Sequence, residues 1–256
     1  MQVISHAEAR QSRQAITLHN GTRVWLSYYL GQNFGSDGRP SGAGSAHEAS
    51  ELHPTAYLVE QDANTEIPAH YHRPDQFQLF TDGDGMVGRW TLNPIIVQFA
   101  GHNTPYGPIK SGSRGLEYMT LRNGWDPGVK WMPQAREELK NTVPNKRRSH
   151  ITNPILPLNA AQLEKTQTDC VSHLHEEDGL QIKVYHLAPG QTILGPDPAT
   201  GRGQFWFVIG GSGSAGESSI QDRSCIFVEP NAAAAQLTAS FTALQVIMMQ
   251  FPRDPL

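Results

Sequence analysis

The amino-acid sequence predicts an all-β protein in which one β-rich unit occurs twice in tandem. The 256-residue chain contains 24 Gly and 18 Pro, and long helical patterns are few, so many short strands joined by turns are expected. The two halves also align with each other without a gap over about seventy positions, which indicates an internal duplication. A chain of this length is sufficient for one large β-domain or for two small ones.

The internal alignment rests on matched residue pairs. Gln76-Phe77 aligns with Gln204-Phe205, an offset of 128 residues. The other matches are Tyr57 with Tyr185, Gly83 with Gly211, Gly85 with Gly213, Phe99 with Phe227, and residues 115–122 with 243–250. Strand and turn residues therefore recur at equal spacing, which predicts two copies of one fold.

Short apolar runs predict the strands of each copy. Residues 16–29 contain two such runs around Asn20-Gly21, a dipeptide typical of a type I′ hairpin. The other strands expected in the first copy are residues 58–59, 77–80, 86–90, 95–99 and 118–121. Those expected in the second copy are residues 182–185, 205–209, 224–228 and 244–251.

The segment between the copies predicts a linker. We expect an N-terminal domain over residues 1–122, a linker over residues 123–165 and a C-terminal domain over residues 166–256. A short helix is expected over residues 133–140 of the linker, where proline occupies the first turn. Residues 31–50 are rich in Gly, Ser and Ala, and predict a long loop that is either disordered or a functional lid.

Composition and charge exclude several classes of function. The formal net charge of −4 gives no reason to expect nucleic acid or an anionic membrane as a partner. No apolar stretch approaches the ~20 residues of a membrane helix, and the N-terminus lacks a basic start followed by an apolar run. Cys170 and Cys225 are too few for a disulfide framework and are expected to be thiols. These features predict a cytoplasmic protein.

The stretch from Asn64 to Gly83 contains the residues best suited to chemistry. His70 and His72 are two residues apart, so on a strand both imidazoles point to the same face and can reach one point inside a barrel. Gln76 follows four residues later, and Gly83 is expected to close the strand into a turn. The pattern resembles the first motif of the cupin superfamily, G-x5-H-x-H-x3-4-E-x6-G, with Asn64 at the glycine and Gln76 at the metal-binding glutamate. The resemblance implies a bicupin, with two jelly-roll (cupin) β-barrels in tandem.

The second cupin motif, P-x-G-x2-H-x3-N, has a looser match in residues 98–110. In one alignment Tyr106 occupies the position of the third histidine, and in the other alignment Lys110 does. The alignment with Tyr106 agrees with the internal repeat and is preferred. His102, on the preceding turn, is the substitute to consider.

The resemblance implies a divalent transition metal in the first barrel. His70, His72 and Gln76 are expected to hold Fe(II), with Mn(II), Ni(II) or Zn(II) as alternatives. Tyr106 or His102 would add a further ligand. The affinity should be low because the anionic ligand is missing. Upstream side chains that can supply a ligand are His47, Glu48, Glu51 and His53, and Asp75 is a candidate to orient an imidazole.

The second copy provides an internal comparison. His70 corresponds to Pro198 and His72 to Thr200, so the second barrel is expected to be degenerate and either structural or part of a homodimer interface. The aromatic residues of the first copy that are expected in the core are Tyr57, Phe77, Phe80, Trp90 and Tyr118.

Three functions are compatible with these residues. The first is a metal-dependent cupin enzyme that acts on a small oxygenated organic molecule by dioxygenase-type chemistry, with Tyr106 and His102 as candidate catalytic residues. The second is a metal-free isomerase, epimerase or lyase in which His70 or His72 is the base and Tyr106 the acid. The third is a non-enzymatic bicupin that binds a small molecule. The fold alone does not choose among them.

Overall fold

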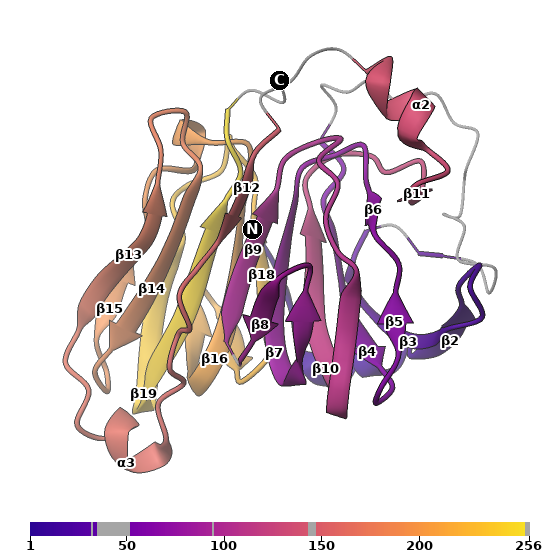
Figure 1. Cartoon of the computed structure of the whole chain (residues 1–256). Coiled ribbons are helices and arrows are strands. Elements are labelled where there is room, and N and C mark those ends of the chain that lie inside the picture. Colours follow the sequence, from indigo (N-terminus) through magenta and orange to yellow (C-terminus); the bar gives the residue numbers. More distant parts are fainter. Residues whose placement is uncertain (32, 35–51, 94, 143–146, 254–256) are drawn as a thin grey trace. The chain divides into compact units, whose positions relative to one another are not determined.

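The computed structural model describes residues 1–31, 33–34, 52–93, 95–142 and 147–253 (Figure 1). The described chain divides into two compact units, one over residues 10–155 and the other combining residues 1–9 with residues 156–253. We call them the N-terminal barrel and the C-terminal barrel. Both consist of antiparallel strands with a few short helices, so the all-β prediction is confirmed. In the described part of the chain, no helix is long and apolar enough to cross a membrane.

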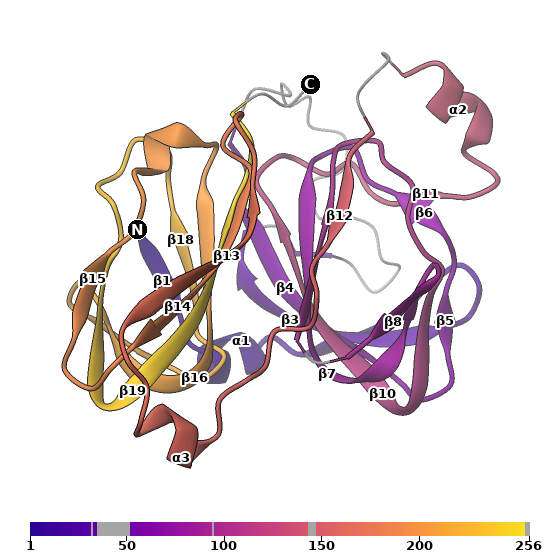
Figure 2. The same cartoon turned by 60° about the vertical axis from the view of Figure 1, so that its left-hand side comes forward.

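The N-terminal barrel is built on a nine-stranded antiparallel sheet with the order β12-β9-β7-β10-β4-β3-β2, in which β5 also pairs with β10 and β8 with β7. A separate pair, β6 and β11, lies near α2 (Figure 2). Its elements are β2 (Gln14–Thr17), β3 (Arg23–Leu30), β4 (Thr55–Gln61), β5 (Glu66–Ile67), β6 (His70–Tyr71), β7 (Gln76–Val87), β8 (Trp90–Leu92), β9 (Ile96–Ala100), β10 (Ile109–Arg122), β11 (Lys130–Trp131), α2 (Arg136–Lys140) and β12 (Ser149–Ile151).

The C-terminal barrel has an eight-stranded sheet with the order β1-β18-β16-β19-β14-β13, in which β15 also pairs with β19 and β17 with β16. The first strand of the chain therefore belongs to this barrel and not to the N-terminal domain in which the sequence placed it. Its elements are β1 (Gln2–Ile4), α1 (His6–Arg10), α3 (Ala160–Leu163), β13 (Asp169–His175), β14 (Gln181–Leu187), β15 (Thr192–Leu194), a 3-10 turn (Pro198–Thr200), β16 (Gln204–Ala215), β17 (Ser218–Gln221), β18 (Cys225–Val228) and β19 (Gln236–Gln250).

Strand register repeats between the two barrels, as the internal alignment predicts. Phe77 pairs with Leu121 and Phe99, and the residue 128 positions later, Phe205, pairs with Met249 and Phe227.

One predicted match is wrong. Tyr57 lies opposite Thr120 on β10, whereas Tyr185 lies opposite Val246, the counterpart of Tyr118. Between β4 and β14, the offset that aligns the two barrels is therefore two residues smaller than it is for the other strands.

Gly83 does not end a strand in a turn, contrary to the expectation from the motif. It lies inside β7 with a φ of 88°, and a Cβ there would overlap the carbonyl oxygen of Gly115 on β10. Gly211 has a φ of 82° and makes the same close approach to Ala243 in the other barrel. Only glycine permits both the backbone angle and the contact, and so both barrels bend a long central strand at this point.

Three local predictions need correction. The hairpin of β2 and β3 forms, but only Gly21 of the Asn20-Gly21 pair has a positive φ, so the turn is not type I′. The strand expected over residues 86–90 is instead a hairpin that reverses at Gly88. The helix begins at Arg136 and not at Pro133.

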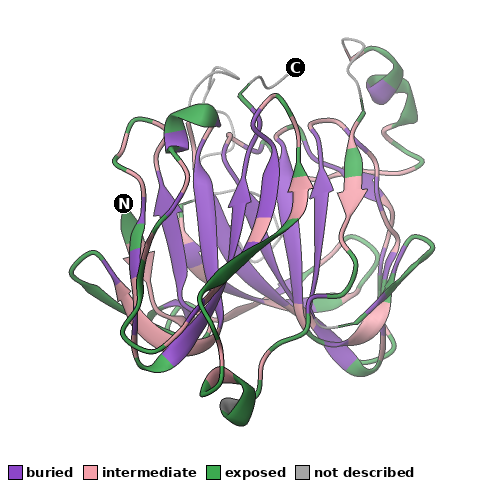
Figure 3. Cartoon of the chain, turned by 90° about the vertical axis from the view of Figure 1, so that its left-hand side faces the viewer, coloured by how far each residue is buried: buried purple, intermediate pink, exposed green. Residues whose placement is uncertain are grey.

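The strands of each barrel are mainly buried and the connections mainly exposed (Figure 3). Of the aromatic residues expected in the core, only Trp90 is exposed, with 49% of its surface accessible. The segment after β10, expected to be a linker, contributes β11, α2 and β12 to the N-terminal barrel, and β12 pairs with β9. Most of the loop expected over residues 31–50 lies outside the described residues.

Candidate functional site

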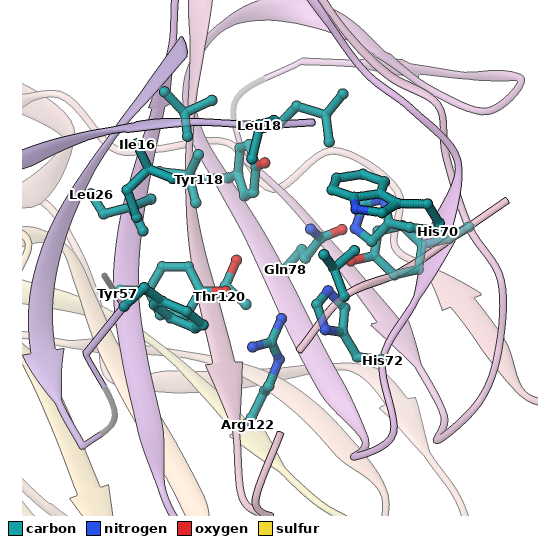
Figure 4. A pocket seen from close by; sticks show the side chains of 17 residues that line it. Ile16, Leu18, Leu26, Tyr57, His70, His72, Gln78, Tyr118, Thr120 and Arg122 are labelled. Carbon is teal, nitrogen blue, oxygen red and sulfur yellow. The ribbon is translucent and has the colours of Figure 1, made fainter. Parts of the chain in front are cut away.

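A cavity of about 100 Å³ lies inside the N-terminal barrel. Figure 4 shows Ile16, Leu18 and Leu26 on one side, and His72, Gln78 and Arg122 on the other. The polar residues of the lining are Tyr57, His70, His72, Gln78, Tyr106, Tyr118, Thr120 and Arg122. The aliphatic residues of the lining are Ile16, Leu18, Val24, Leu26, Val59, Ile67 and Val129. The cavity therefore has an apolar part and a polar part, which is the usual character of a small-molecule site.

The backbone of β6 holds His70 against Tyr106. The two residues exchange backbone hydrogen bonds of 3.1 and 2.9 Å, and their rings lie 4.5 Å apart. His70 Nδ1 donates to the Pro68 carbonyl oxygen at 2.7 Å, because a carbonyl can only accept. Burial, assisted by the neighbouring His72, lowers the His70 pKa to about 3. The ring is therefore neutral, with its Nε2 lone pair available as an acceptor.

His72 forms a buried chain with Asp126 and Arg122. His72 Nδ1 lies 2.8 Å from Asp126 Oδ2, and the same oxygen lies 2.7 Å from an Arg122 terminal nitrogen. Burial alone would raise the Asp126 pKa, but Arg122 and His72 outweigh it and hold that pKa well below its usual range. The ionised carboxylate accepts from His72 Nδ1, so His72 Nε2 also carries a lone pair. Burial, followed by the charge of Arg122, lowers the His72 pKa, and Asp126 opposes this only in part. The lowered pKa keeps the imidazole neutral.

Tyr106, the residue preferred at the third-histidine position, lines the cavity together with the two histidines. Its ring is 4.5 Å from His70 and lies roughly parallel to His72 at 6.4 Å. Burial raises the pKa of the phenol well above its usual value, and Arg122 only partly offsets this. Tyr106 therefore remains protonated and can act as a hydrogen-bond donor or acid.

The other predicted site residues lie outside the cavity lining. Gln76 Oε1 accepts a hydrogen bond from Arg122 Nε at 3.2 Å, so the carboxamide oxygen already has a partner. His102 accompanies Asp75, which accepts from the His102 backbone at 2.6 Å and lies 3.4 Å from its Nδ1. Asp75 thus faces His102 and no imidazole of the cavity. Lys110 forms an exposed ion pair with Glu66 at 3.1 Å.

Of the upstream candidates, only His53 lies among the described residues. His53 packs beside Trp125, with ring centroids 5.8 Å apart, and is not part of the cavity lining. His47, Glu48 and Glu51 lie outside the described residues.

Four polar residues of the site, Gln78, Thr120, Arg122 and Asp126, were not predicted from the sequence. Arg122 was visible as a charged residue at the end of a predicted strand, and Gln78 as a polar residue on the same face as Gln76. Asp126 follows β10 in an irregular segment and had no signal of its own. Tyr57 and Tyr118, expected in the core, are buried as predicted and also line the cavity.

Among the residues that the structure describes, the donor atoms that face the cavity do not fit a resident divalent metal ion. His70 and His72 supply two neutral ligands, whereas such a site needs at least three and favours an anionic one. Among the described residues, no three His, Cys, Asp or Glu side chains converge in a way that could hold a metal. Arg122, in the same wall, is a permanent positive charge that disfavours protonation of both imidazoles, and it would oppose a metal cation in the same way.

The C-terminal barrel is filled at the corresponding positions. Trp206 stands at the counterpart of Gln78 and is fully buried, with its ring 5.2 Å from Tyr185. Gln250 stands at the counterpart of Arg122, where it accepts from Gln204 at 2.7 Å and donates to the Gly179 carbonyl at 2.7 Å. These polar groups satisfy one another within the barrel.

Comparisons with known proteins identify the fold. No protein-family model matches the sequence, and a search of curated proteins finds no match. Among solved structures, a proposed dioxygenase from Nostoc punctiforme superposes with a TM-score of 0.58 at 12% identity, covering 99% of this chain and 82% of that chain. An oxalate decarboxylase variant from Bacillus subtilis gives 0.55 at 11% identity, with 99% and 78% covered.

A third structure extends the comparison. The oxalate decarboxylase of Lactobacillus farciminis, solved as a formate complex, gives a TM-score of 0.56 at 12% identity, with 98% of this chain and 86% of that chain covered. All three are cupin-fold proteins, so the jelly-roll prediction is confirmed. At these identities the likeness shows the fold alone.

Proposed function

We propose that the N-terminal barrel is a metal-free cupin enzyme that moves a proton on a small oxygenated organic molecule. The observation that supports this is the buried His72–Asp126 pair at the cavity, with Nδ1 to Oδ2 at 2.8 Å. A carboxylate behind an imidazole fixes the tautomer, orients the ring and stabilises the imidazolium that forms when Nε2 accepts a proton. Hydrolases and isomerases use this arrangement for general-base catalysis.

The two histidines have different roles in this proposal. His70 is backed by a carbonyl oxygen and has its pKa lowered to about 3, so it is a weak base and serves as a hydrogen-bond acceptor. His72 is backed by an ionised carboxylate and is therefore the base. Tyr106, which stays protonated, donates to the oxygen of the substrate on which negative charge develops.

Proton exchange with solvent tests this function, because it detects the proton transfer itself whatever product is formed. Chelator-treated protein is incubated in D2O with a panel of 2-hydroxy acids, enolisable 2-oxo acids and uncharged ketones, and loss of the proton on the carbon next to the carbonyl or carboxyl group is followed by NMR. His72→Asn should lower the exchange rate at least about 100-fold while the protein stays folded. His102→Asn is the matched control, because His102 lies outside the cavity, and it should leave the rate unchanged. Equal rates in wild type and His72→Asn would contradict the proposal.

The metal-dependent, dioxygenase-type enzyme is the second candidate. It is favoured by one observation: both imidazoles donate Nδ1–H to an oxygen, which is the usual support for histidines that ligate through Nε2. His70 and His72 would hold the ion, which would supply Lewis-acid or oxygen chemistry. Elemental analysis of wild type and the His70→Ala/His72→Ala variant decides between the candidates. One transition metal per chain that disappears in the variant would support this second function.

A further inference from the structure

The unpaired polar atoms of the cavity indicate what it binds. Gln78 is 3% exposed, and its Oε1 atom has no hydrogen-bond partner among the described residues. A buried polar atom without a partner is costly, and native proteins tolerate it mainly where a ligand or water completes it. Gln78 lies across from Thr120 in the β7–β10 ladder and points into the cavity (Figure 4). A hydroxyl group of a ligand would supply the missing donor.

Arg122 gives this part of the cavity its charge. Its side chain is 1% exposed, and its guanidinium reaches the cavity, whereas its partner Asp126 is not among the lining residues. The ion pair therefore presents its positive end to a ligand. Guanidinium groups bind carboxylates strongly because charge and hydrogen bonds act together. An anionic group of the ligand is the complement of this surface.

The opposite part of the cavity excludes a purely polar ligand. Ile16, Leu18, Val24 and Leu26 line it from β2, β3 and the hairpin that joins them. Burial of an apolar group against these side chains is favourable by roughly 25 cal/mol per Å². The ligand should therefore carry a hydrocarbon body as well as its charged end.

The C-terminal barrel shows what occupies the same positions where no ligand site is proposed. Where the N-terminal barrel has Gln78 and Arg122, it has Trp206 and Gln250, and their side-chain hydrogen bonds are made inside the protein. At corresponding positions, the N-terminal barrel therefore has a buried guanidinium and a carboxamide oxygen that faces the cavity without a partner among the described residues, whereas the C-terminal barrel has a buried indole and a carboxamide whose hydrogen bonds are made inside the protein.

We infer that the cavity binds a small organic acid that has an apolar body and a hydroxyl group next to its carboxylate. Arg122 binds the carboxylate, Gln78 Oε1 accepts from the hydroxyl, and the aliphatic residues enclose the body. This inference rests on the proposed function in that it assigns the substrate class of the same site. It places the hydroxyl-bearing carbon on the polar side of the cavity, where His72 also lies.

Isothermal titration calorimetry with four probes tests the inference. Mandelate has all three features, phenylacetate lacks the hydroxyl, 2-phenylethanol lacks the charge and oxalate lacks the apolar body. Mandelate should bind about 10-fold more tightly than phenylacetate, and at least about 10-fold more tightly than 2-phenylethanol or oxalate. Absence of saturable mandelate binding, or equal binding of 2-phenylethanol, would overturn the inference.

Two substitutions assign the recognition to the named residues. Gln78→Glu adds a negative charge and should weaken both phenyl-bearing anions at least about 10-fold without weakening 2-phenylethanol. Gln134→Glu is the control for the added charge, since Gln134 is exposed and is not a lining residue. Arg122→Lys keeps the positive charge but loses the planar guanidinium that can donate two parallel hydrogen bonds. It should therefore weaken the binding of mandelate and phenylacetate. Unchanged mandelate affinity in folded Gln78→Glu would also overturn the inference.

The binding and exchange measurements together separate this inference from the proposed function. The order of probe affinities is measured in the wild-type protein, so it tests the ligand class without any change at the base. Binding that follows the expected order, combined with proton exchange that is insensitive to His72→Asn, would support the ligand class and refute the proposed enzyme. Exchange that depends on His72 but acts only on uncharged substrates would refute the ligand class alone.

Discussion

His72 and Asp126 meet at 2.8 Å although they are 54 residues apart in the chain. Asp126 lies just beyond the end of β10, and β10 pairs with β7, which begins shortly after His72. The register of this central strand pair therefore brings the two side chains to one end of the barrel. Arg122, the last residue of β10, completes the contact by pairing with the same carboxylate oxygen.

The Arg122–Asp126 ion pair should show strong energetic coupling. Asp126→Asn leaves a buried guanidinium without its countercharge, and Arg122→Met leaves a buried carboxylate, so each should lower the free energy of unfolding by about 3–5 kcal/mol. The double variant should lose less than the sum, because no unpaired charge remains. Urea denaturation of the four proteins measures the coupling.

An exposed ion pair provides the control for this double-mutant cycle. Glu137 and Lys140 lie 2.7 Å apart on α2, where both side chains are largely exposed, and their coupling should stay below about 0.5 kcal/mol. Additive effects at Arg122 and Asp126 would show that the buried pair does not act as a unit.

Gln78→Trp should close the cavity. The substitution introduces the residue that fills the corresponding position of the C-terminal barrel, where Trp206 is fully buried. Mandelate binding should be lost, while overpacking should cost no more than about 3 kcal/mol. Trp206→Ala, in contrast, removes a packed side chain and should cost about 3–5 kcal/mol. Retained mandelate affinity in a folded Gln78→Trp protein would place the ligand elsewhere.

Acid should destabilise the N-terminal barrel before its carboxylates titrate. Burial lowers the folded-state pKa values of His70 and His72 below the unfolded value of 6.5, so the unfolded chain binds protons first as the pH falls. The free energy of unfolding should therefore decrease from pH 6.5 toward pH 3. Asp126, whose pKa is lowered from 3.8, adds a further loss below that value.

The slope of stability against pH checks this assignment. Thermal unfolding between pH 7 and pH 4 should depend less on pH in His70→Asn/His72→Asn than in wild type. His102→Asn should keep the wild-type slope. A double variant with the wild-type slope would mean that other groups cause the acid sensitivity.

Gly83→Ala should be far more damaging than Gly21→Ala. Both glycines have positive φ, at 88° and 82°, so both substitutions carry a backbone cost of about 1–2 kcal/mol. At Gly21 nothing lies within 4 Å of the new Cβ, whereas at Gly83 it would overlap the Gly115 backbone. Gly83→Ala should therefore cost more than about 3 kcal/mol in urea denaturation, and similar costs at both sites would contradict the close approach.

Much of the fold could be predicted from the sequence. The strand pattern can be read within each short segment, and the repeat can be found by aligning the chain with itself. The pocket positions of His70 and His72 follow from their two-residue spacing. Asp126 could not be predicted, because its contact with His72 depends on the strand register and on an irregular segment after β10. The local errors arose where glycine conformation decides the path, as at Gly83 and Gly88, since neither residue type nor spacing reveals φ.

The guanidinium group of Arg122 gives the cavity a permanent positive charge. Burial alone would favour the neutral form of Arg122, but Asp126 outweighs this and raises its pKa further above an already high value, so the side chain does not titrate at any pH that the fold withstands. Acidification within that range cannot convert the pocket from an anion receptor into a neutral one. Binding of a weak acid should instead follow the ionisation of the acid, and only the protonation of His70 and His72, whose pKa values are lowered, would add a contribution from the protein at low pH.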